Sequence, residues 1–355
     1  MESFVYTSLP SRVVFGRGTI ARLPDEAERL GAQRVLVLTT PQQKSQGESI
    51  GRILGGRVVS LFDDATMHTP IEVTDRALAV VEAHRIDCLL AVGGGSTTGL
   101  GKAIALRTDL PQIVLPTTYA GSEMTTILGQ TENGRKTTLK DPAVLPEVVI
   151  YDVDLTLSLP PGLSGTSGIN AIAHAVEALY AENRNPVMSL IAEQGVAALA
   201  RSLPVIARAP DNIDARQQAL YGAWLCAVCL GSSGVALHHK LCHVLGGSFD
   251  LPHAETHTIV LPHALAYNAP AVPEAMSTLS RALETNDPPA ALYDLAVSVG
   301  AATALRDIGM AEDGIETATR ITLENPYWNP CPIEADRIRD LLSDAWAGKR
   351  PGPVA

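Results

Sequence analysis

The pattern of apolar residues changes near the middle of the chain, and this change limits the folds that the chain can adopt. Before about residue 160, short runs rich in Val, Ile and Leu alternate with segments of helical periodicity. Continuous apolar runs are typical of strands covered on both faces, as in a parallel sheet. Strands are expected over residues 34–40, 58–62, 87–95, 112–118 and 147–154, and helices over residues 74–84 and 96–107. The sequence therefore predicts an α/β N-terminal domain with a doubly wound, Rossmann-like parallel sheet.

The remainder of the chain predicts only helices. Strand signals stop after residues 160–165 (PPGLSG), and long Ala- and Leu-rich periods with polar breaks follow. A chain of 355 residues is longer than one hydrophobic core usually serves. We therefore expect a nucleotide-binding α/β domain over residues 1–160 and an all-α catalytic domain over residues 161–355.

Charge and cysteine content narrow the class of protein. A formal net charge of -11 argues against nucleic acid or an anionic membrane as partner, since both favour basic patches. The N-terminus lacks a basic region followed by a long apolar segment, and we expect no later run to be long and apolar enough to span a bilayer, which predicts a cytoplasmic protein. The five cysteines do not indicate a disulfide framework, and Cys226 and Cys229 are interpreted as small buried helix residues.

A glycine-rich segment, AVGGGSTTGLGKAIAL, is the strongest sign of a nucleotide site. Its strand ends in Gly93, Gly94 and Gly95, and Ser96 is expected to open a helix. Glycines let backbone N–H groups approach a pyrophosphate, and a helix N-terminus carries partial positive charge. The alternative is a turn that merely needs glycine, but the strand-turn-helix setting favours phosphate.

Hydroxyl groups follow two expected strands, at the edge where open α/β sheets bind cofactors. LPTTYAGSEMT places Thr117, Thr118 and Ser122 after one strand, where they can bind phosphate, ribose or the nicotinamide amide. Thr40 follows another strand, at a position where NAD-selective proteins often carry an acidic residue. The absence of an acidic residue at this position predicts that both NADH and NADPH are accepted.

Two other glycine-containing segments are interpreted as turns. FGRGTIARL resembles part of a GxGxxG pattern but lacks the third glycine. Asn133-Gly134, within ILGQTENGRKTTL, suits a tight turn between two strands of a hairpin.

The histidines are concentrated in one stretch of the helical half. Six of the nine lie between residues 230 and 263, which indicates proton handling, metal ligation or both. His239 and His243 are four residues apart and would share one helix face, and His253 begins a second helical run. Asn170 and His174 are also four apart on an earlier helix, which makes His174 a companion of the cluster. For any single histidine, a hydrogen-bonded core role is the alternative.

Five ordered motifs resemble the iron-containing alcohol dehydrogenase family. They are GGGS (residues 93–96), PTTYAGSE (116–123), NAIAHAVEA (170–178), HHKLCHVLGG (238–247) and LPHAETHTIVLPHALAYN (251–268). The resemblance implies the dehydroquinate synthase-like architecture of that family, with an active site in the cleft between an α/β domain and an all-helical domain. It also implies a homodimer.

The resemblance places the family's metal ligands on Asn170, His174, His239 and His253. In metal-using members, an aspartate and three histidines hold iron or zinc, so Asn170 is a departure. A neutral amide removes one negative charge from a dication site and lowers its affinity, although three imidazoles can still hold zinc. We therefore expect an enzyme that does not require a metal.

Within the family, the motifs GGGSTTGLGKAIAL, YAGSEMT, HHKLCH and ENPYWNP resemble the branch that reduces maleylacetate, in the breakdown of aromatic compounds. This branch implies hydride transfer from NADH or NADPH to the double bond of a small dicarboxylate enone. We expect His243 to donate the proton and His253 to stabilise the developing oxyanion, while His174, His239 and Asn170 shape the pocket.

The substrate carboxylates need cationic partners. Lys240, Arg135, Lys136 and the histidines are the candidates, and Asn170, Lys240, His243 and His253 are the expected substrate-binding residues. A further departure lies at Gly99, where many family members carry an aspartate that contacts the cofactor.

Two other functions stay open at this point. A metal-dependent alcohol or polyol dehydrogenase of the same family would use His174, His239 and His253 as iron or zinc ligands. A non-enzymatic nucleotide sensor would bind NADH but reduce no carbonyl or enone.

Overall fold

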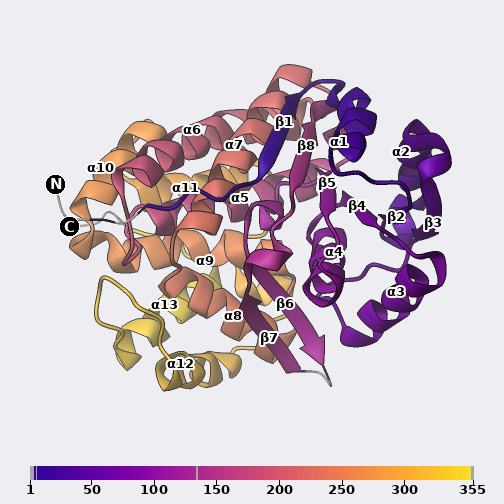
Figure 1. Cartoon of the computed structure of the whole chain (residues 1–355). Coiled ribbons are helices and arrows are strands. Elements are labelled where there is room, and N and C mark those ends of the chain that lie inside the picture. The colour runs from indigo at the N-terminus through magenta and orange to yellow at the C-terminus, as the bar shows by residue number, and fades with distance from the viewer. Residues whose placement is uncertain (1–3, 5, 133–134, 353–355) are drawn as a thin grey trace. The chain divides into compact units, whose positions relative to one another are not determined.

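The computed structural model describes residue 4 and residues 6–132 and 135–352. The chain divides into two compact units, of which one is Ser8–Leu159 and the other combines the described residues before Ser8 with those from Pro160 onward. The first is an α/β unit and the second is helical. Figure 1 shows the elements of each unit.

The α/β unit is built on a six-stranded parallel sheet whose order is β1-β8-β5-β4-β2-β3 (Figure 1). Its strands are β1 (Arg12–Gly16), β2 (Val35–Leu38), β3 (Val58–Phe62), β4 (Cys88–Gly93), β5 (Gln112–Pro116) and β8 (Val148–Asp152). Its helices are α1 (Leu23–Arg29), α2 (Lys44–Leu54), α3 (Ile71–His84) and α4 (Gly95–Thr108). The predicted doubly wound sheet is confirmed, and β1 is the strand that the sequence pattern missed.

Alternate residues of the strands build a core on each face of this sheet. Val35, Val37, Leu90 and Val92 pack with α1 and α2, where Leu23 belongs to the same cluster. Leu36, Leu38, Leu89 and Ala91 belong to a second cluster with residues of α3 and α4. Burial on both faces explains why the strands have continuous apolar runs instead of alternating ones.

A two-stranded antiparallel sheet joins β6 (Ile127–Glu132) to β7 (Arg135–Lys140), as expected for a hairpin. The turn predicted at Asn133-Gly134 lies outside the described residues, and so do the side chains of Arg135 and Lys136.

The described residues after Pro160 form helices and no strand. The helices are α5 (Pro161–Ala178), α6 (Pro186–Arg208), α7 (Ile213–Ser232), α8 (Leu237–Phe249), α9 (His253–Asn268), α10 (Pro273–Ala282), α11 (Pro288–Ser298), α12 (Gly314–Glu324) and α13 (Ala335–Ala347). Cys226 and Cys229 are buried in α7 without a disulfide, in agreement with their interpretation as core residues.

One expectation about apolar segments is wrong. By length and composition, helix α6 is long and apolar enough to cross a membrane, and α7 and α8 meet the same criteria together, although they are bent by 94° at the break between them. Within α6, 50% of the most apolar window is buried in the described structure. A core helix of a helical unit meets the same criteria of length and composition, because it is apolar on several sides.

The backbones of α6 and α7 approach each other closely at two glycines. A Cβ atom added to Gly222 would lie 2.9 Å from the carbonyl oxygen of Gly195 and 2.9 Å from the side chain of Leu199. A backbone oxygen cannot rotate away, so a methyl group at this position would force the helices apart.

We therefore expect Gly222→Ala to lower the free energy of unfolding by about 1–3 kcal/mol, as overpacked cores do. Urea unfolding followed by circular dichroism measures this change. The control is Gly162→Ala in α5, where an added Cβ meets no atom within 4 Å. Equal stability of the two variants would show that the helices yield to the added methyl group.

Candidate active site

The predicted strand-turn-helix segment is present in the α/β unit. Strand β4 ends at Gly93, and α4 begins at Gly95, one residue before the expected Ser96. A Cβ atom on Gly94 would lie 2.9 Å from the side chain of Thr118, and one on Gly93, whose φ is +149°, would lie 2.6 Å from Gln43. The glycines are therefore needed for close packing, and the first N–H groups of α4 have no partner within the helix. An anion such as a pyrophosphate would fill that role.

Gln43 joins two of the predicted cofactor-binding residues. Its amide nitrogen donates to Thr117 Oγ1 at 2.9 Å, and its amide oxygen accepts from Thr40 Oγ1 at 3.3 Å. Thr40 follows β2 and Thr117 follows β5, while the glycine turn follows β4, which lies between these strands in the sheet. The structure therefore brings these residues to the carboxyl edge of the sheet, where α/β proteins bind ligands.

The departure at Gly99 has a local structural reason. A Cβ atom on Gly99 would lie 2.5 Å from Thr69 Oγ1. Thr69 is itself held at a φ of 46°, so its backbone has little freedom to move aside. An aspartate at residue 99 would not fit beside Thr69 in its present position.

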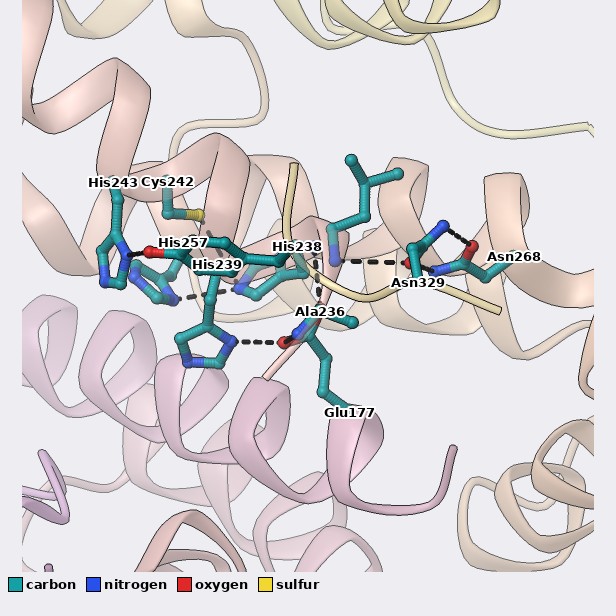
Figure 2. A network of polar contacts seen from close by, with 11 residues as sticks. Glu177, Ala236, His238, His239, Cys242, His243, His257, Asn268 and Asn329 are labelled. Atoms are coloured by element: carbon teal, nitrogen blue, oxygen red, sulfur yellow. Dashed lines mark hydrogen bonds and ion pairs between the residues drawn. The ribbon is translucent and has the colours of Figure 1, made fainter. Parts of the chain in front are cut away.

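Glu177 organises the histidine cluster of the helical unit. Its carboxylate, on α5, is fully buried and accepts the backbone N–H groups of Ala236 and His238, each at 2.7 Å. It also lies 2.7 Å from His239 Nδ1. Figure 2 shows Glu177 beneath the start of α8 with the His239 ring directed at its carboxylate. Because a carboxylate oxygen only accepts, Nδ1 of His239 carries a proton, and in the neutral form of the ring Nε2 then keeps its lone pair.

Three buried atoms, two on α5 and one on α8, have no hydrogen-bond partner among the described residues. They are Asn170 Oδ1, His174 Nδ1 and His239 Nε2. The rings of His174 and His239 stack at 5.3 Å between centroids. Burial, with a smaller contribution from His239 and His253, lowers the pKa of His174 well below its usual value. Neutral imidazoles and an amide oxygen are donors that a divalent iron or zinc ion accepts, so this set fits a metal.

A second compact group consists of His238, Cys242 and His257, whose donor atoms lie within 4.8 Å of one another. His238 Nε2 is 3.0 Å from His257 Nδ1 and 3.7 Å from Cys242 Sγ. Figure 2 shows the three side chains next to one another. All three side chains are buried, and burial lowers the pKa of both histidines and raises that of the thiol. Their mutual hydrogen bonds explain their approach, so we interpret the group as a polar core contact.

Helix α8 also carries Lys240, which is buried, and His243, which is exposed. His243 Nδ1 lies 3.0 Å from the hydroxyl of Tyr327, and Lys240 Nζ lies 5.5 Å from the centroid of the same ring. Tyr327 belongs to a loop that Asn329 holds through a reciprocal amide pair with Asn268, at 2.9 and 2.7 Å. The loop therefore brings a phenol to the predicted proton donor.

His253 lies at the start of α9 and is exposed. Its ring centroid is 4.3 Å from that of His257, which in turn lies 5.1 Å from that of His239. The structure thus brings the predicted residues His174, His239, His243 and His253 into one cluster. Sequence reasoning gave no role to Glu177, Tyr327 or Gln43; the ENPYWNP motif was the one signal that pointed to Tyr327.

We expect Glu177→Gln to lower stability and activity together, because the amide weakens three contacts and removes the charge that fixes the His239 tautomer. The free energy of unfolding should fall by about 1.5–3 kcal/mol, the range for a hydrogen bond to a charged group. Urea unfolding and turnover measure the two effects. The control is Glu255→Gln in the first turn of α9. A Glu177→Gln variant with unchanged turnover would show that the tautomer of His239 is set by another group.

Comparison with known proteins agrees with this arrangement. Residues 10–153 match the model described as "Iron-containing alcohol dehydrogenase", and residues 164–346 match "Fe-containing alcohol dehydrogenase family, C-terminal". Maleylacetate reductase from Rhizobium sp. strain MTP-10005 is 53% identical over 99% of this chain and 100% of its own length. The maleylacetate reductase of Sphingobium indicum is 55% identical over 98% of this chain and 99% of its own.

Solved structures give the same result. Maleylacetate reductase from Agrobacterium tumefaciens has a TM-score of 0.96 at 53% identity, covering 99% of this chain and 100% of that one. A 1,3-propanediol oxidoreductase has a TM-score of 0.91 at 25% identity, covering 97% and 100% of the two chains. The match to both family models, over nearly the whole length, shows that this chain is an oxidoreductase that belongs to the iron-containing alcohol dehydrogenase family.

Proposed function

We propose that the chain reduces the carbon-carbon double bond of maleylacetate with NADH or NADPH, giving 3-oxoadipate in the breakdown of aromatic compounds. Relatives named maleylacetate reductase are 51–55% identical over almost all of both chains, which supports this substrate. The observation on the structure that carries the proposal is Lys240, a buried cation beside the predicted proton donor.

Lys240 differs from the other buried lysine of the described structure. Four oxygen atoms surround Nζ of Lys102 within hydrogen-bonding distance. Nζ of Lys240 instead lies over the Tyr327 ring, and no carboxylate of the described residues is within ion-pair distance of it. Burial lowers the pKa of Lys240 from its usual value, partly offset by Glu324. An ammonium removed from water needs an anion, and a substrate carboxylate would supply one.

The reaction places charge on the substrate oxygen. Hydride adds to the alkene carbon β to the ketone, so the electron pair of the double bond moves to the ketone oxygen as an enolate. A hydrogen-bond donor stabilises this oxyanion, and an acid then protonates the carbon next to the ketone. We assign the first role to His253 and the second to His243, whose Nδ1 is held by Tyr327 at 3.0 Å. Asn170, His174 and His239 shape the pocket.

The cofactor assignment uses the α/β unit. The first N–H groups of α4 after Gly93–Gly95 would bind the pyrophosphate, and Thr117, Thr118 and Ser122 would bind ribose or the nicotinamide amide. Thr40 stands where an acidic residue would repel a 2'-phosphate, so we propose that NADPH is accepted as well as NADH.

A metal-dependent alcohol dehydrogenase is the second candidate, and the unpaired donors favour it. Asn170, His174, His239 and His253 would hold the ion, which would polarise a carbonyl oxygen as a Lewis acid. The family is named for iron, so the expectation that no metal is required has no support from the relatives. Nothing in the cluster favours a non-enzymatic sensor. A homodimeric state and a cytoplasmic location stay predictions.

Metal removal separates the two candidates. We expect chelator-treated protein to oxidise NADH with maleylacetate at the same rate without metal as after zinc or ferrous iron is restored. The physical reason is that an enone needs less activation than an alcohol. Absorbance of NADH, together with metal analysis of the protein, measures this. Activity that returns only with metal would move the three histidines into ligand roles, and turnover of alcohols alone would contradict the proposed substrate.

Two substitutions on α8 should act on different kinetic constants. Lys240→Met should raise KM for maleylacetate about 10- to 100-fold with a smaller effect on kcat, since a charged hydrogen bond contributes about 1.5–3 kcal/mol. His243→Ala should lower kcat more than it raises KM. The control is Lys349→Met, which removes an exposed lysine of the same unit. A Lys240→Met variant with the KM of the unaltered protein would exclude Lys240 as the carboxylate partner.

A further inference from the structure

Lys102 lies inside the α/β unit, where the proposed reaction does not use it. Its side chain, on α4, has no exposed surface. Residue 102 lies seven positions after Gly95, about 10 Å along the helix from the glycine turn. A lysine is almost never fully buried unless it is paired, so its partners identify its role.

The ammonium group of Lys102 is surrounded by oxygen atoms from one loop. Nζ lies within hydrogen-bonding distance of the carbonyl oxygens of Ser122 (2.6 Å), Thr125 (2.8 Å) and Ile127 (2.9 Å) and of Thr125 Oγ1 (2.8 Å), so at least one N–H is shared between two oxygens. An ammonium group has three N–H donors and no acceptor, so a site made only of acceptors suits its charged form.

Its charge is balanced mainly by carbonyl dipoles. Glu123 is an acidic group whose charge influences Lys102, but its Oε1 accepts from the hydroxyl of Tyr151 at 2.8 Å. Burial lowers the pKa of Lys102 to about 7, and Glu123 opposes that shift. The loop carbonyls therefore hold the ammonium in place, and the ammonium holds the loop.

This loop is one of the two segments proposed to bind the cofactor. It begins with Thr117 and Thr118 after β5 and continues through the short helix Ser122–Met124. Thr118 packs against Gly94, so the first end of the loop is fixed beside the glycine turn. Lys102 fixes its other end to the same helix, α4.

We propose that Lys102 is a positioning residue for the dinucleotide, which sets the spacing between the glycine turn and the Thr117–Ile127 loop. This inference rests on the cofactor site in the proposed function. It requires the positive charge and its hydrogen bonds, whereas a residue that only fills the core would require the volume of the side chain.

The test measures NADH affinity by nicotinamide fluorescence, in folded protein without substrate. Lys102→Met keeps most of the volume and removes the charge, and it should raise the dissociation constant at least about tenfold, equivalent to about 1.4 kcal/mol. The control is Lys140→Met, which changes an exposed lysine in the same unit. Wild-type affinity in Lys102→Met would overturn the inference, while failure of the unaltered protein to bind NADH or NADPH would instead contradict the proposed function.

Chemical rescue separates a positioning role from a structural one. Lys102→Ala leaves space for the missing propylammonium group, so propylamine should restore at least half of the lost affinity, and 1-propanol at the same concentration should not. Loss of NADH affinity that propylamine does not restore in folded Lys102→Ala would contradict the proposal.

If both lysine variants fail to fold, the Thr125→Val variant tests the positioning role of Lys102. It removes one of the four oxygen contacts and should raise the NADH dissociation constant about threefold, since a single hydrogen bond contributes about 0.5–1.5 kcal/mol. Unchanged affinity in Thr125→Val would then overturn the inference.

Discussion

The carboxylate of Glu177 is the interaction on which the histidine cluster depends. It is fully buried, it accepts hydrogen bonds from backbone N–H groups at the start of α8, and it fixes the ring of His239. Helix α8 has no capping side chain of its own, so a carboxylate from α5 replaces the usual local cap. The same negative charge favours the N-terminal end of the helix dipole. The position of α8, and with it the places of Lys240 and His243, therefore follows from one residue of a distant helix.

Two buried lysines show how the surroundings of a charge indicate its function. Lys102 is satisfied by oxygen atoms of its own chain, and this matches a residue that holds backbone in place. Lys240 has an aromatic ring beside it and no carboxylate partner in the described structure, and this matches a residue that waits for an anionic ligand. Both side chains are buried, so it is their partners that separate the proposed positioning lysine from the proposed binding lysine.

Local sequence patterns were sufficient to predict most of the secondary structure and the fold class. Continuous apolar runs predicted the buried strands, and glycines predicted the turn after β4. A separation of four residues placed Asn170 with His174, and His239 with His243, on one helix face each. Strand β1 was missed because only Val13, Val14 and Phe15 are apolar in it, a run too short to separate from a turn. The contacts of Glu177, Gln43 and Tyr327 join residues 62, 74 and 84 positions apart, and no local pattern encodes such pairs. The same limit applies to α6, whose apolar character reflects burial among helices and is indistinguishable by composition from a membrane span.

The proposed function depends most on which carbon of the substrate receives the hydride. NADH that carries deuterium at the transferable position would be oxidised with maleylacetate, and the product would be examined by nuclear magnetic resonance. Reduction of the enone places deuterium on the methylene carbon β to the ketone, next to the distant carboxylate, while the carbon beside the ketone receives a solvent proton. Deuterium on a carbinol carbon, with the double bond intact, would contradict the account and identify a carbonyl reductase of the alcohol dehydrogenase type.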